Sequence, residues 1–250
     1  MSLTLEEKIQ MAVSWLQQQV RESGTKGIVV GISGGIDSAV VANLIKRAFP
    51  DNSLGVLIPI KSNIKDLEDG RAVAEKAGIK YIEVDLGEFQ SSLLNTVTQQ
   101  LKLAGLFQEN NLRITDANLR ARLRMSTLYT VANNLGYLVA GTDNAAEVYT
   151  GYFTKYGDGG VDILPLATLK KYEVYEWAKV LGVPQQVIDR PPTAGLWEGQ
   201  TDEAEMGTSY ALIDAYLEGK DIPQKDKEII DRLHKISAHK RVMPPYPEFK

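Results

Sequence analysis

Hydrophobic residues in the first hundred positions alternate between helical and strand spacing. Ile9, Val13, Leu16 and Val20 share one face of a helix, and the preceding Thr4-Leu5-Glu6-Glu7 matches a capping box. Apolar runs at residues 27–30 and 54–60 are typical of buried parallel strands. The same pattern predicts a helix from residue 39, helices at residues 64–77 and 89–103, and a strand at residues 81–84.

The second half continues this alternation with a helix at residues 115–134, a strand at 137–140 and a helix at 168–181. Val174 and Trp177 in the last helix are expected to be core residues. Strands that alternate with helices predict an α/β fold, a doubly wound parallel sheet flanked by helices and Rossmann-like in layout. Ligands of such sheets bind beyond the carboxyl ends of the strands.

A glycine and serine turn lies between the first predicted strand and the helix that follows it. Backbone N–H groups and the positive end of the helix converge at such a turn, which suits a phosphate group. The Lys of a P-loop NTPase is absent, and an acidic residue at the helix start suits a metal that bridges phosphates. A tight strand-to-helix turn is the structural alternative. The residues of this loop are Gly31, Ile32, Ser33, Gly34, Gly35, Ile36, Asp37 and Ser38.

Two further segments carry polar residues that invite a functional interpretation. The loop after strand 137–140 leads from Thr142 to Glu147, and residues 151–162 are too rich in glycine and polar groups for regular structure. The predicted helix 115–134 carries Arg120, Arg122 and Arg124. Helical positions two apart point in different directions, so these arginines are not expected to serve one site.

Composition narrows the possible functions. The 250 residues, 44% of them hydrophobic, are enough for one α/β domain spanning residues 1–250. A net charge of −4 disfavours a nucleic-acid partner. Cysteine is absent, which excludes disulfides, thiolate metal sites and a cysteine nucleophile. The first ten residues lack an apolar core, so no signal peptide or membrane span is expected, and the expected location is the cytoplasm.

The Ser-Gly-Gly-x-Asp-Ser pattern resembles the phosphate loop of the ATP pyrophosphatases. Residues 141–162, the Pro192-Thr193-Ala194-Gly195-Leu196 segment and His239-Lys240-Arg241 extend the likeness over nearly the whole chain, which is similar to the NAD synthetase family. The resemblance implies an adenine nucleotide alpha hydrolase-like fold. It also implies an ATP-dependent ligase that amidates deamido-NAD to NAD in the final step of NAD biosynthesis, with release of AMP and pyrophosphate.

The resemblance also assigns roles to individual residues. Residues 31–38 would cradle the ATP phosphates, and Asp37 and Glu147 would hold Mg²⁺. Asp158 matches the residue that handles ammonia. The other matching positions would contact ATP, namely Thr142, Lys171 and Thr193, or deamido-NAD, namely Arg122, Lys155, Asp162, His239 and Lys240. By sequence alone Asp37 also fits a helix cap and Glu147 a solvated helix residue, while His239 is more typical of a surface position.

The expected reaction needs no nucleophilic side chain. The nicotinate carboxylate attacks the α-phosphate of ATP, and ammonia then attacks the acyl adenylate, so the protein supplies positioning and charge neutralisation. Glutamine-dependent members of the family carry an additional amidase domain with a catalytic cysteine, and this chain has no cysteine. Free ammonia is therefore the expected donor, with a separate amidase subunit left open.

Two positions depart from the family pattern, and three alternative functions remain. Ile36 and Asn144 stand where many bacterial members have Gln and His, with consequences expected for nucleotide affinity or choice of nitrogen donor. A tRNA-thiolating pyrophosphatase, another small-molecule ligase of the superfamily and a non-catalytic nucleotide-binding module are the alternatives. Family members form homodimers, and helix 115–134 is the expected interface. The polar segment between Gly195 and Gly207 is expected to be a loop ordered by ATP.

Overall fold

The computed structural model describes residues 3–192 and 201–249. Its centre is a parallel sheet of four strands in the order β3-β2-β1-β4. These are β1 (Gly27–Gly31), β2 (Ser53–Leu57), β3 (Lys80–Glu83) and β4 (Tyr137–Ala140). An isolated parallel bridge joins Ala140 to Ile163 beside β4. The predicted doubly wound α/β sheet is confirmed.

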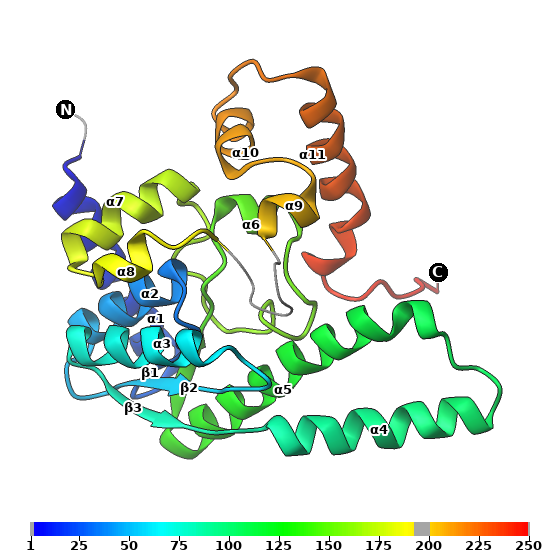
Figure 1. Ribbon diagram of the computed structural model, residues 1–250. Helices are drawn as coiled ribbons and strands as arrows, with labels where there is room; N and C mark the ends of the chain where they lie inside the picture. The colour runs from blue at the N-terminus through cyan, green and yellow to red at the C-terminus, as the bar shows by residue number, and fades with distance from the viewer. Residues whose placement is uncertain (1–2, 193–200, 250) are drawn as a thin grey trace.

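Helices cover both faces of this sheet (Figure 1). On one face α2 (Ile36–Ala48) packs against α1 (Leu5–Ser23), α3 (Ile64–Ala77) and α7 (Lys171–Leu181), and α8 (Gln185–Ile188) follows α7. On the other face α5 (Leu112–Leu135) contacts β1 and β4. Alternate residues of β1 enter the two cores, since Ile28 and Val30 lie on the α2 side and Val29 on the α5 side.

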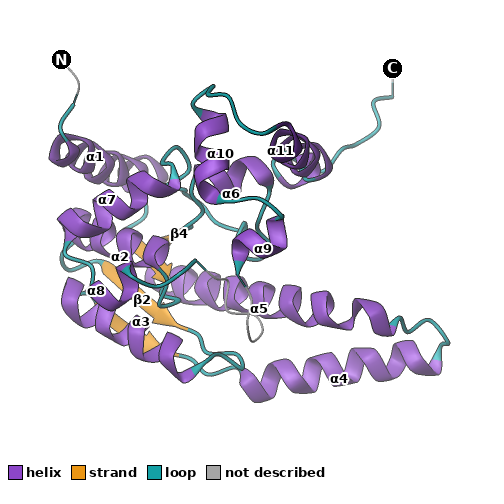
Figure 2. Ribbon diagram, turned by 45° about the horizontal axis from the view of Figure 1, so that its top comes forward, coloured by secondary structure: helices purple, strands orange, loops and turns teal. Residues whose placement is uncertain are grey.

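A two-helix arm projects from the body of the molecule (Figures 1 and 2). It consists of α4 (Gly87–Leu103), the 3₁₀ turn η1 (Glu109–Asn111) and the first part of α5. Gln90 is the only described residue of α4 that is fully buried, and its side-chain amide donates to Asp116 at 2.5 Å. Most of the α4 surface in this arm is therefore exposed to solvent.

The last part of the chain forms a helical group with an apolar cluster of its own. Ile213 and Ile230 lie at the centre of this cluster, together with Ala146, Met206 and Tyr210. Among the residues described here, no helix is long and apolar enough to cross a membrane. The elements of this group are α6 (Ala145–Thr150), α9 (Asp202–Met206), α10 (Tyr210–Leu217), α11 (Gln224–Ile236) and η2 (Ala238–Lys240).

Several predicted boundaries differ from the structure, including those of α2, β3, α4 and α5, which differ by one to three residues. The run at residues 54–60 is a strand only to Leu57, because Pro59 has no N–H to donate. Beyond Leu57 the pairing is irregular, and the Leu86 N–H donates to the carbonyl of Pro59. The helix predicted at 168–181 begins at Lys171. Asp202–Met206, expected to belong to a loop, forms α9, because Thr201 caps it and Asp202 and Met206 are buried. Residues 196–200 of that expected loop lie outside the described residues.

Candidate active site

Hydrogen bonds among its own residues fix the conformation of the phosphate loop. Ser38 Oγ accepts from the Ser33 N–H at 3.2 Å and donates to the Gly35 carbonyl at 2.9 Å, and Ser33 Oγ accepts from the Gly35 N–H at 3.2 Å. Gly34 has φ +85°, and a Cβ there would collide with the Asp66 carbonyl oxygen. Gly35 begins α2 without a side-chain cap, so the helix start is available to an anion.

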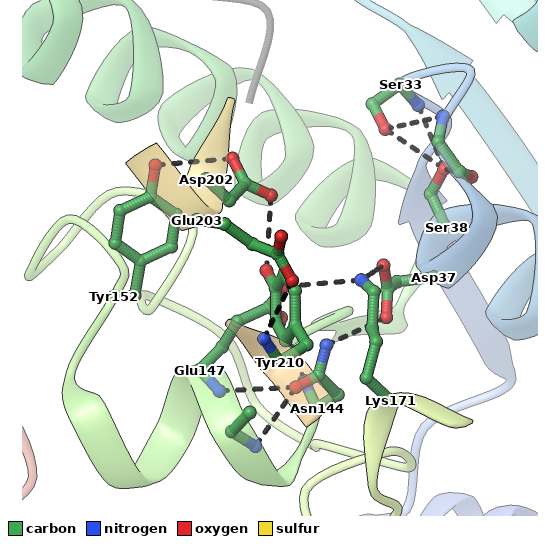
Figure 3. Close-up of polar contacts among 12 residues, drawn as sticks. Ser33, Asp37, Ser38, Asn144, Glu147, Tyr152, Lys171, Asp202, Glu203 and Tyr210 are labelled. Carbon is green, nitrogen blue, oxygen red and sulfur yellow. Dashed lines mark hydrogen bonds and ion pairs between the residues drawn. The ribbon is translucent and has the colours of Figure 1, made fainter. Parts of the chain in front are cut away.

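Asp37 and Glu147 converge on one ammonium group although 110 positions separate them in the sequence. Lys171 Nζ lies 2.6 Å from Asp37 Oδ2 and 3.7 Å from Glu147 Oε1 (Figure 3). Lys171 is buried in the first turn of α7, Asp37 lies in the first turn of α2, and Glu147 in that of α6. The structure therefore brings the two predicted metal ligands together with a predicted ATP contact.

Asn144 fixes the relative positions of these two carboxylates. Its Oδ1 accepts from the N–H groups of Ala146 and Glu147, which caps α6, and its Nδ2 donates to Asp37 Oδ1 at 3.0 Å (Figure 3). Glu147 Oε2 accepts from the Asn144 N–H at 3.0 Å, which completes a capping box. One fully buried amide thus connects α6 to the phosphate loop.

Tyr210 connects Glu147 to α9. Its hydroxyl lies 2.8 Å from Glu147 Oε1 and 3.1 Å from Asp202 Oδ2 (Figure 3). The Tyr152 hydroxyl lies 3.2 Å from Asp202 Oδ1 and 2.7 Å from Glu205 Oε2. A row of alternating hydroxyls and carboxylates therefore runs from the candidate metal ligands to the protein surface.

Burial and charge shift the titration of this group in opposite directions. Burial, reinforced by the neighbouring Asp37 charge, raises the pKa of Glu147 to about 7. Burial alone would lower the pKa of Lys171, but the carboxylates of Asp37 and Glu147 outweigh it and raise that pKa above its usual value. Lys171 therefore remains a cation at neutral pH.

A cavity of about 610 Å³ lies beside the phosphate loop, at the carboxyl ends of the strands. Its walls come from the phosphate loop, the end of β2, the middle of α5 and residues 151–161. This position is the one expected for a ligand of a doubly wound sheet. Polar residues that line the cavity include Ser33, Asp37, Arg124, Thr142, Asp143, Glu147, Asp158, Lys171, Arg190, Asp202 and Lys240.

The glycine-rich segment at residues 151–162 is a loop, as predicted. Lys240 Nζ donates to the carbonyls of Gly151 at 2.8 Å and Phe153 at 2.5 Å, and Lys155 Nζ donates to the His239 carbonyl at 2.6 Å. The Arg122 guanidinium lies 3.4 Å from the Lys155 carbonyl. Four predicted deamido-NAD contacts, namely Arg122, Lys155, His239 and Lys240, are therefore neighbours in space.

The remaining predicted residues are placed differently. Asp162 accepts from Tyr129 Oη at 2.9 Å and from the Val139 N–H at 2.8 Å, so it lies beside β4 and not among the residues that line the cavity. Asp158 accepts from the Thr154 N–H at 2.9 Å and faces the cavity. Thr193 lies outside the described residues.

Sequence reasoning missed several residues of the cavity wall. Arg124 donates to the Ile58 carbonyl at 3.2 Å and to Ser62 Oγ at 3.3 Å, and burial lowers its pKa to about 10. The three arginines of α5 do diverge as expected, since Arg120 pairs with Asp116. Asp143, Asp202 and Tyr210 were also missed. Asp143 does lie in the 142–147 segment already marked for a functional interpretation, three residues after the end of β4.

The fold and the site define a class of protein. A parallel sheet with a glycine-rich anion loop after its first strand, and two carboxylates converging beside that loop, is the arrangement of an ATP-binding α/β enzyme of the adenine nucleotide alpha hydrolase-like fold.

Comparison with known proteins identifies the family. The family model for NAD synthase matches residues 8–244, and the chain belongs to this family. It is 66% identical to the NH(3)-dependent NAD(+) synthetase of Alkaliphilus oremlandii (strain OhILAs), over 99% of both chains. Among solved structures it is similar to an NMN synthetase from Francisella tularensis, with 38% identity, a TM-score of 0.92 and coverage of 99% and 100% of the two chains. The NH3-dependent NAD synthetase from Campylobacter jejuni gives a TM-score of 0.77 at 29% identity, with the same coverage of the two chains.

Proposed function

We propose that this protein amidates deamido-NAD to NAD with ATP and ammonia. The observation that carries the proposal is the convergence of Asp37, Glu147 and Lys171 beside an anion loop, in a cavity that cationic residues also line. Such a site neutralises two anionic substrates that must react with each other. The membership of the NAD synthase family and the 66% identity to an ammonia-dependent enzyme support the same activity.

The first step joins the nicotinate carboxylate to the α-phosphate of ATP. A carboxylate oxygen forms the new P–O bond, and the bond to the pyrophosphate leaving group breaks. The phosphate loop N–H groups and Lys171 would hold the ATP phosphates, while Lys240 and Arg124, which line the same cavity, would hold the second anion. Positioning and charge neutralisation are sufficient for this step.

The second step replaces AMP with nitrogen. Ammonia attacks the carbonyl carbon of the acyl adenylate, the C–N bond forms, and the C–O bond to AMP breaks. Asp158 faces the cavity where this carbonyl would lie and is proposed to handle ammonia. The cavity wall must also exclude water, which would hydrolyse the intermediate. The chain contains no cysteine, so free ammonia is the proposed donor.

The residues present fit a divalent cation. Across residues 3–192 and 201–249 no three Asp, Glu or His side chains form a metal cluster, but Asp37 and Glu147 offer oxygen ligands around one cation position. Two carboxylates that share a cation with substrate phosphates are a usual arrangement for Mg²⁺. Asp37 and Glu147 would hold Mg²⁺, which would offset the charge that grows on pyrophosphate.

The solved NMN synthetase, with its TM-score of 0.92, favours a second candidate substrate. This would be the corresponding mononucleotide, which carries the same nicotinate carboxylate without the adenylate half. The two substrates present the same reacting group, so the chemistry of the site does not separate them.

One assay tests both candidates. Pyrophosphate release is measured with ATP, Mg²⁺ and either deamido-NAD or nicotinate mononucleotide, with and without ammonium, while NAD is followed with alcohol dehydrogenase. We expect pyrophosphate and NAD to appear together with deamido-NAD. Turnover with the mononucleotide alone would replace the proposed substrate, and ATP binding without pyrophosphate release from either would indicate a non-catalytic module.

We also propose that the protein is a homodimer that buries the α4 arm. Phe89, Leu93, Val97 and Leu101 form an exposed apolar stripe at four-residue spacing on α4. Such a stripe marks an interaction surface, and its continuity with α5, the helix that carries Arg122, favours a second copy over another partner. The interface expected from the sequence lies on the adjoining α5, and the proposal adds the α4 stripe to it.

Sedimentation equilibrium tests the interface. Val97→Glu places a charge in the stripe and is expected to shift the protein to monomer, whereas Gln99→Glu, on the exposed polar side of α4, is the matched control. A dimer that survives Val97→Glu would contradict the α4 interface. We further propose that residues 1–250 act as one domain and that the protein works in the cytoplasm.

A further inference from the structure

The helix α10 carries two buried polar side chains that the proposed mechanism has not used. Its buried residues are Tyr210, Ile213 and Asp214, and only Ile213 is a purely apolar member of the cluster in the helical group. Burial of a hydroxyl or a carboxylate is costly unless each finds partners. Tyr210 and Asp214 lie four positions apart, so they share one face of the helix. Their partners therefore show what this face does.

The partners belong to the two helices that carry charged groups of the site. Among the described residues that line the cavity, none comes from α10. The helix packs instead against α6, which carries Glu147, and against α7, which carries Lys171 (Figure 1). It thus contacts the site from behind, through the elements that form the site.

The hydroxyl of Tyr210 fixes one oxygen of Glu147. It lies 2.8 Å from Glu147 Oε1, closer than the 3.1 Å to Asp202 Oδ2 (Figure 3). Burial and the charges of Glu147 and Asp202 raise the pKa of Tyr210, so the hydroxyl keeps its proton and can donate it. Glu147 Oε2 already accepts from the Asn144 N–H at 3.0 Å. Each oxygen of Glu147 therefore has a fixed hydrogen bond and retains a lone pair for a cation.

The ring of Tyr210 contacts the other member of the charged pair. Lys171 Nζ lies over this ring, 4.6 Å from its centre, which is within the range of a cation–π attraction. The same Nζ lies 3.7 Å from Glu147 Oε1. One side chain thus contacts the carboxylate with its hydroxyl and the ammonium group with its ring, and so fixes their separation.

Asp214 holds the start of the helix that carries Lys171. Its Oδ1 accepts from the Lys171 N–H and its Oδ2 from the Tyr172 N–H, both at 3.2 Å. Lys170, the N-cap residue of α7, has no side-chain oxygen that could accept from these groups. A carboxylate from α10 therefore supplies the acceptors that the first turn of α7 needs, and its charge is favourable at this end of the helix.

We propose that α10 positions the active site, with Tyr210 orienting Glu147 toward the metal ion and Asp214 orienting Lys171 toward the ATP phosphates. The inference rests on the proposed function, which supplies the roles of Glu147 and Lys171. Tyr210 and Asp214 are positioning residues, because they act through the two side chains that line the cavity. One turn of a single helix thus sets where an anion and a cation of the site lie.

Tyr210→Phe tests the metal side, because it removes the hydroxyl and keeps the ring. The affinity for Mn²⁺ is measured from the electron paramagnetic resonance signal of free Mn²⁺, with α,β-methylene-ATP bound. We expect it to fall by about 10- to 100-fold, the usual effect of losing a hydrogen bond to a metal ligand. Saturating Mg²⁺ should return pyrophosphate release to within about twofold of the wild type, which a misfolded variant would not do. An unchanged Mn²⁺ affinity would overturn the role of Tyr210.

Tyr216→Phe is the matched control on the same helix. Tyr216 donates to Asp231 Oδ1 at 2.6 Å, and none of its described contacts is with Glu147 or Lys171. This variant should lower the melting temperature and leave the Mn²⁺ affinity unchanged. A loss of Mn²⁺ affinity as large as that of Tyr210→Phe would show that a weakened α10 is sufficient, and would overturn the inference.

Asp214→Asn tests the ATP side. It keeps the shape of the side chain but loses the charge and one of the two acceptors. We expect the affinity for α,β-methylene-ATP, measured by calorimetric titration with Mg²⁺ present, to fall by about fivefold. Asp226→Asn is the control, because Asp226 accepts from Thr208 Oγ1 at 2.8 Å within the same helical group and does not line the cavity. Equal affinities in the two variants would overturn the role of Asp214.

These binding measurements need no deamido-NAD, so they separate the inference from the proposed amidation. If both variants behave as expected and the wild type forms no NAD, the amidation is contradicted and the positioning by α10 stands. If the wild type binds no Mn²⁺ in the presence of the nucleotide analogue, the roles of Glu147 and Lys171 fail, and the inference is overturned with them.

Discussion

The side-chain amide of Asn144 donates to the Asp37 carboxylate at 3.0 Å while its oxygen caps the helix that carries Glu147. A single side chain thus sets the separation of the two candidate metal ligands. Many bacterial relatives are expected to have His at this position, and an imidazole can donate to Asp37 but has no oxygen for the α6 cap. In this chain the cap and the donor are one residue.

Asn144→Ser and Asn144→Ala separate these two roles. Serine keeps an oxygen that can cap α6 but loses the donor to Asp37, whereas alanine loses both. We expect Asn144→Ala to lower the free energy of unfolding by about 2–4 kcal/mol, as the sum of a lost cap and a lost hydrogen bond to a charged group. Asn144→Ser should recover about 1 kcal/mol of this loss. Urea unfolding measures both, and equal stability of the two variants would contradict the capping role.

Gly34 and Gly24 offer a comparison of strain with and without a steric clash. Both have positive φ, but a Cβ at Gly34 would meet the Asp66 carbonyl, whereas a Cβ at Gly24 would meet nothing within 4 Å. Gly24→Ala should cost about 1 kcal/mol. Gly34→Ala should cost more and weaken ATP binding, because either the phosphate loop or the start of α3 must move. Calorimetric titration with ATP checks this, and equal ATP affinity in both variants would contradict it.

Glu147 makes the folding stability depend on pH. Its pKa is raised to about 7 in the folded protein, so the folded state binds this proton more tightly than the unfolded state. The stability gained in this way is present below the unfolded pKa and is lost as the pH rises through 7. Between pH 5 and 8 the wild type should therefore lose on the order of 1–3 kcal/mol relative to Glu147→Gln.

Denaturant unfolding of both proteins at several pH values measures this difference. A constant difference across the range would show that Glu147 does not titrate there. An increase in the relative stability of the wild type with pH would reverse the sign and contradict a raised pKa.

Lys240 supports the 151–162 loop through two backbone carbonyls. Lys240→Met keeps the length and apolar stem but removes both hydrogen bonds. We expect the KM for deamido-NAD to rise by about tenfold or more, since hydrogen bonds to a charged group contribute about 1.5–3 kcal/mol. The KM for ATP should change little, and an equal rise in both values would indicate a general loss of structure.

The sequence predicted the bounds of a helix or strand well where capping residues or glycines mark both of its ends. The helix α3 spans Ile64–Ala77 as predicted, because Asn63 caps its start and Gly78 ends it in the left-handed region. The strand β4 spans Tyr137–Ala140, also as predicted, between Gly136 and Gly141. In both cases residues next to each other in the sequence determine the ends.

The missed residues owe their roles to contacts between distant segments. Tyr210 lies 63 positions from Glu147, which its hydroxyl contacts, and Arg124 lies 66 positions from Ile58, whose carbonyl it contacts. No spacing rule connects such positions, and from its neighbours in the sequence Tyr210 looks like an ordinary helical aromatic. The metal and ATP assignments came from the resemblance, and the structure shows the proximity of Asp37, Glu147 and Lys171 that they require.

Lys171 also affects the stability of the protein when no substrate is bound. Its ammonium group occupies the point where the Asp37 and Glu147 carboxylates converge, so the chain carries its own cation for the place proposed for magnesium. Two partly buried carboxylates without a partner would repel each other and oppose folding. The enzyme can therefore fold, and persist without ATP or magnesium, with the repulsion between these two carboxylates offset by an ammonium group of its own.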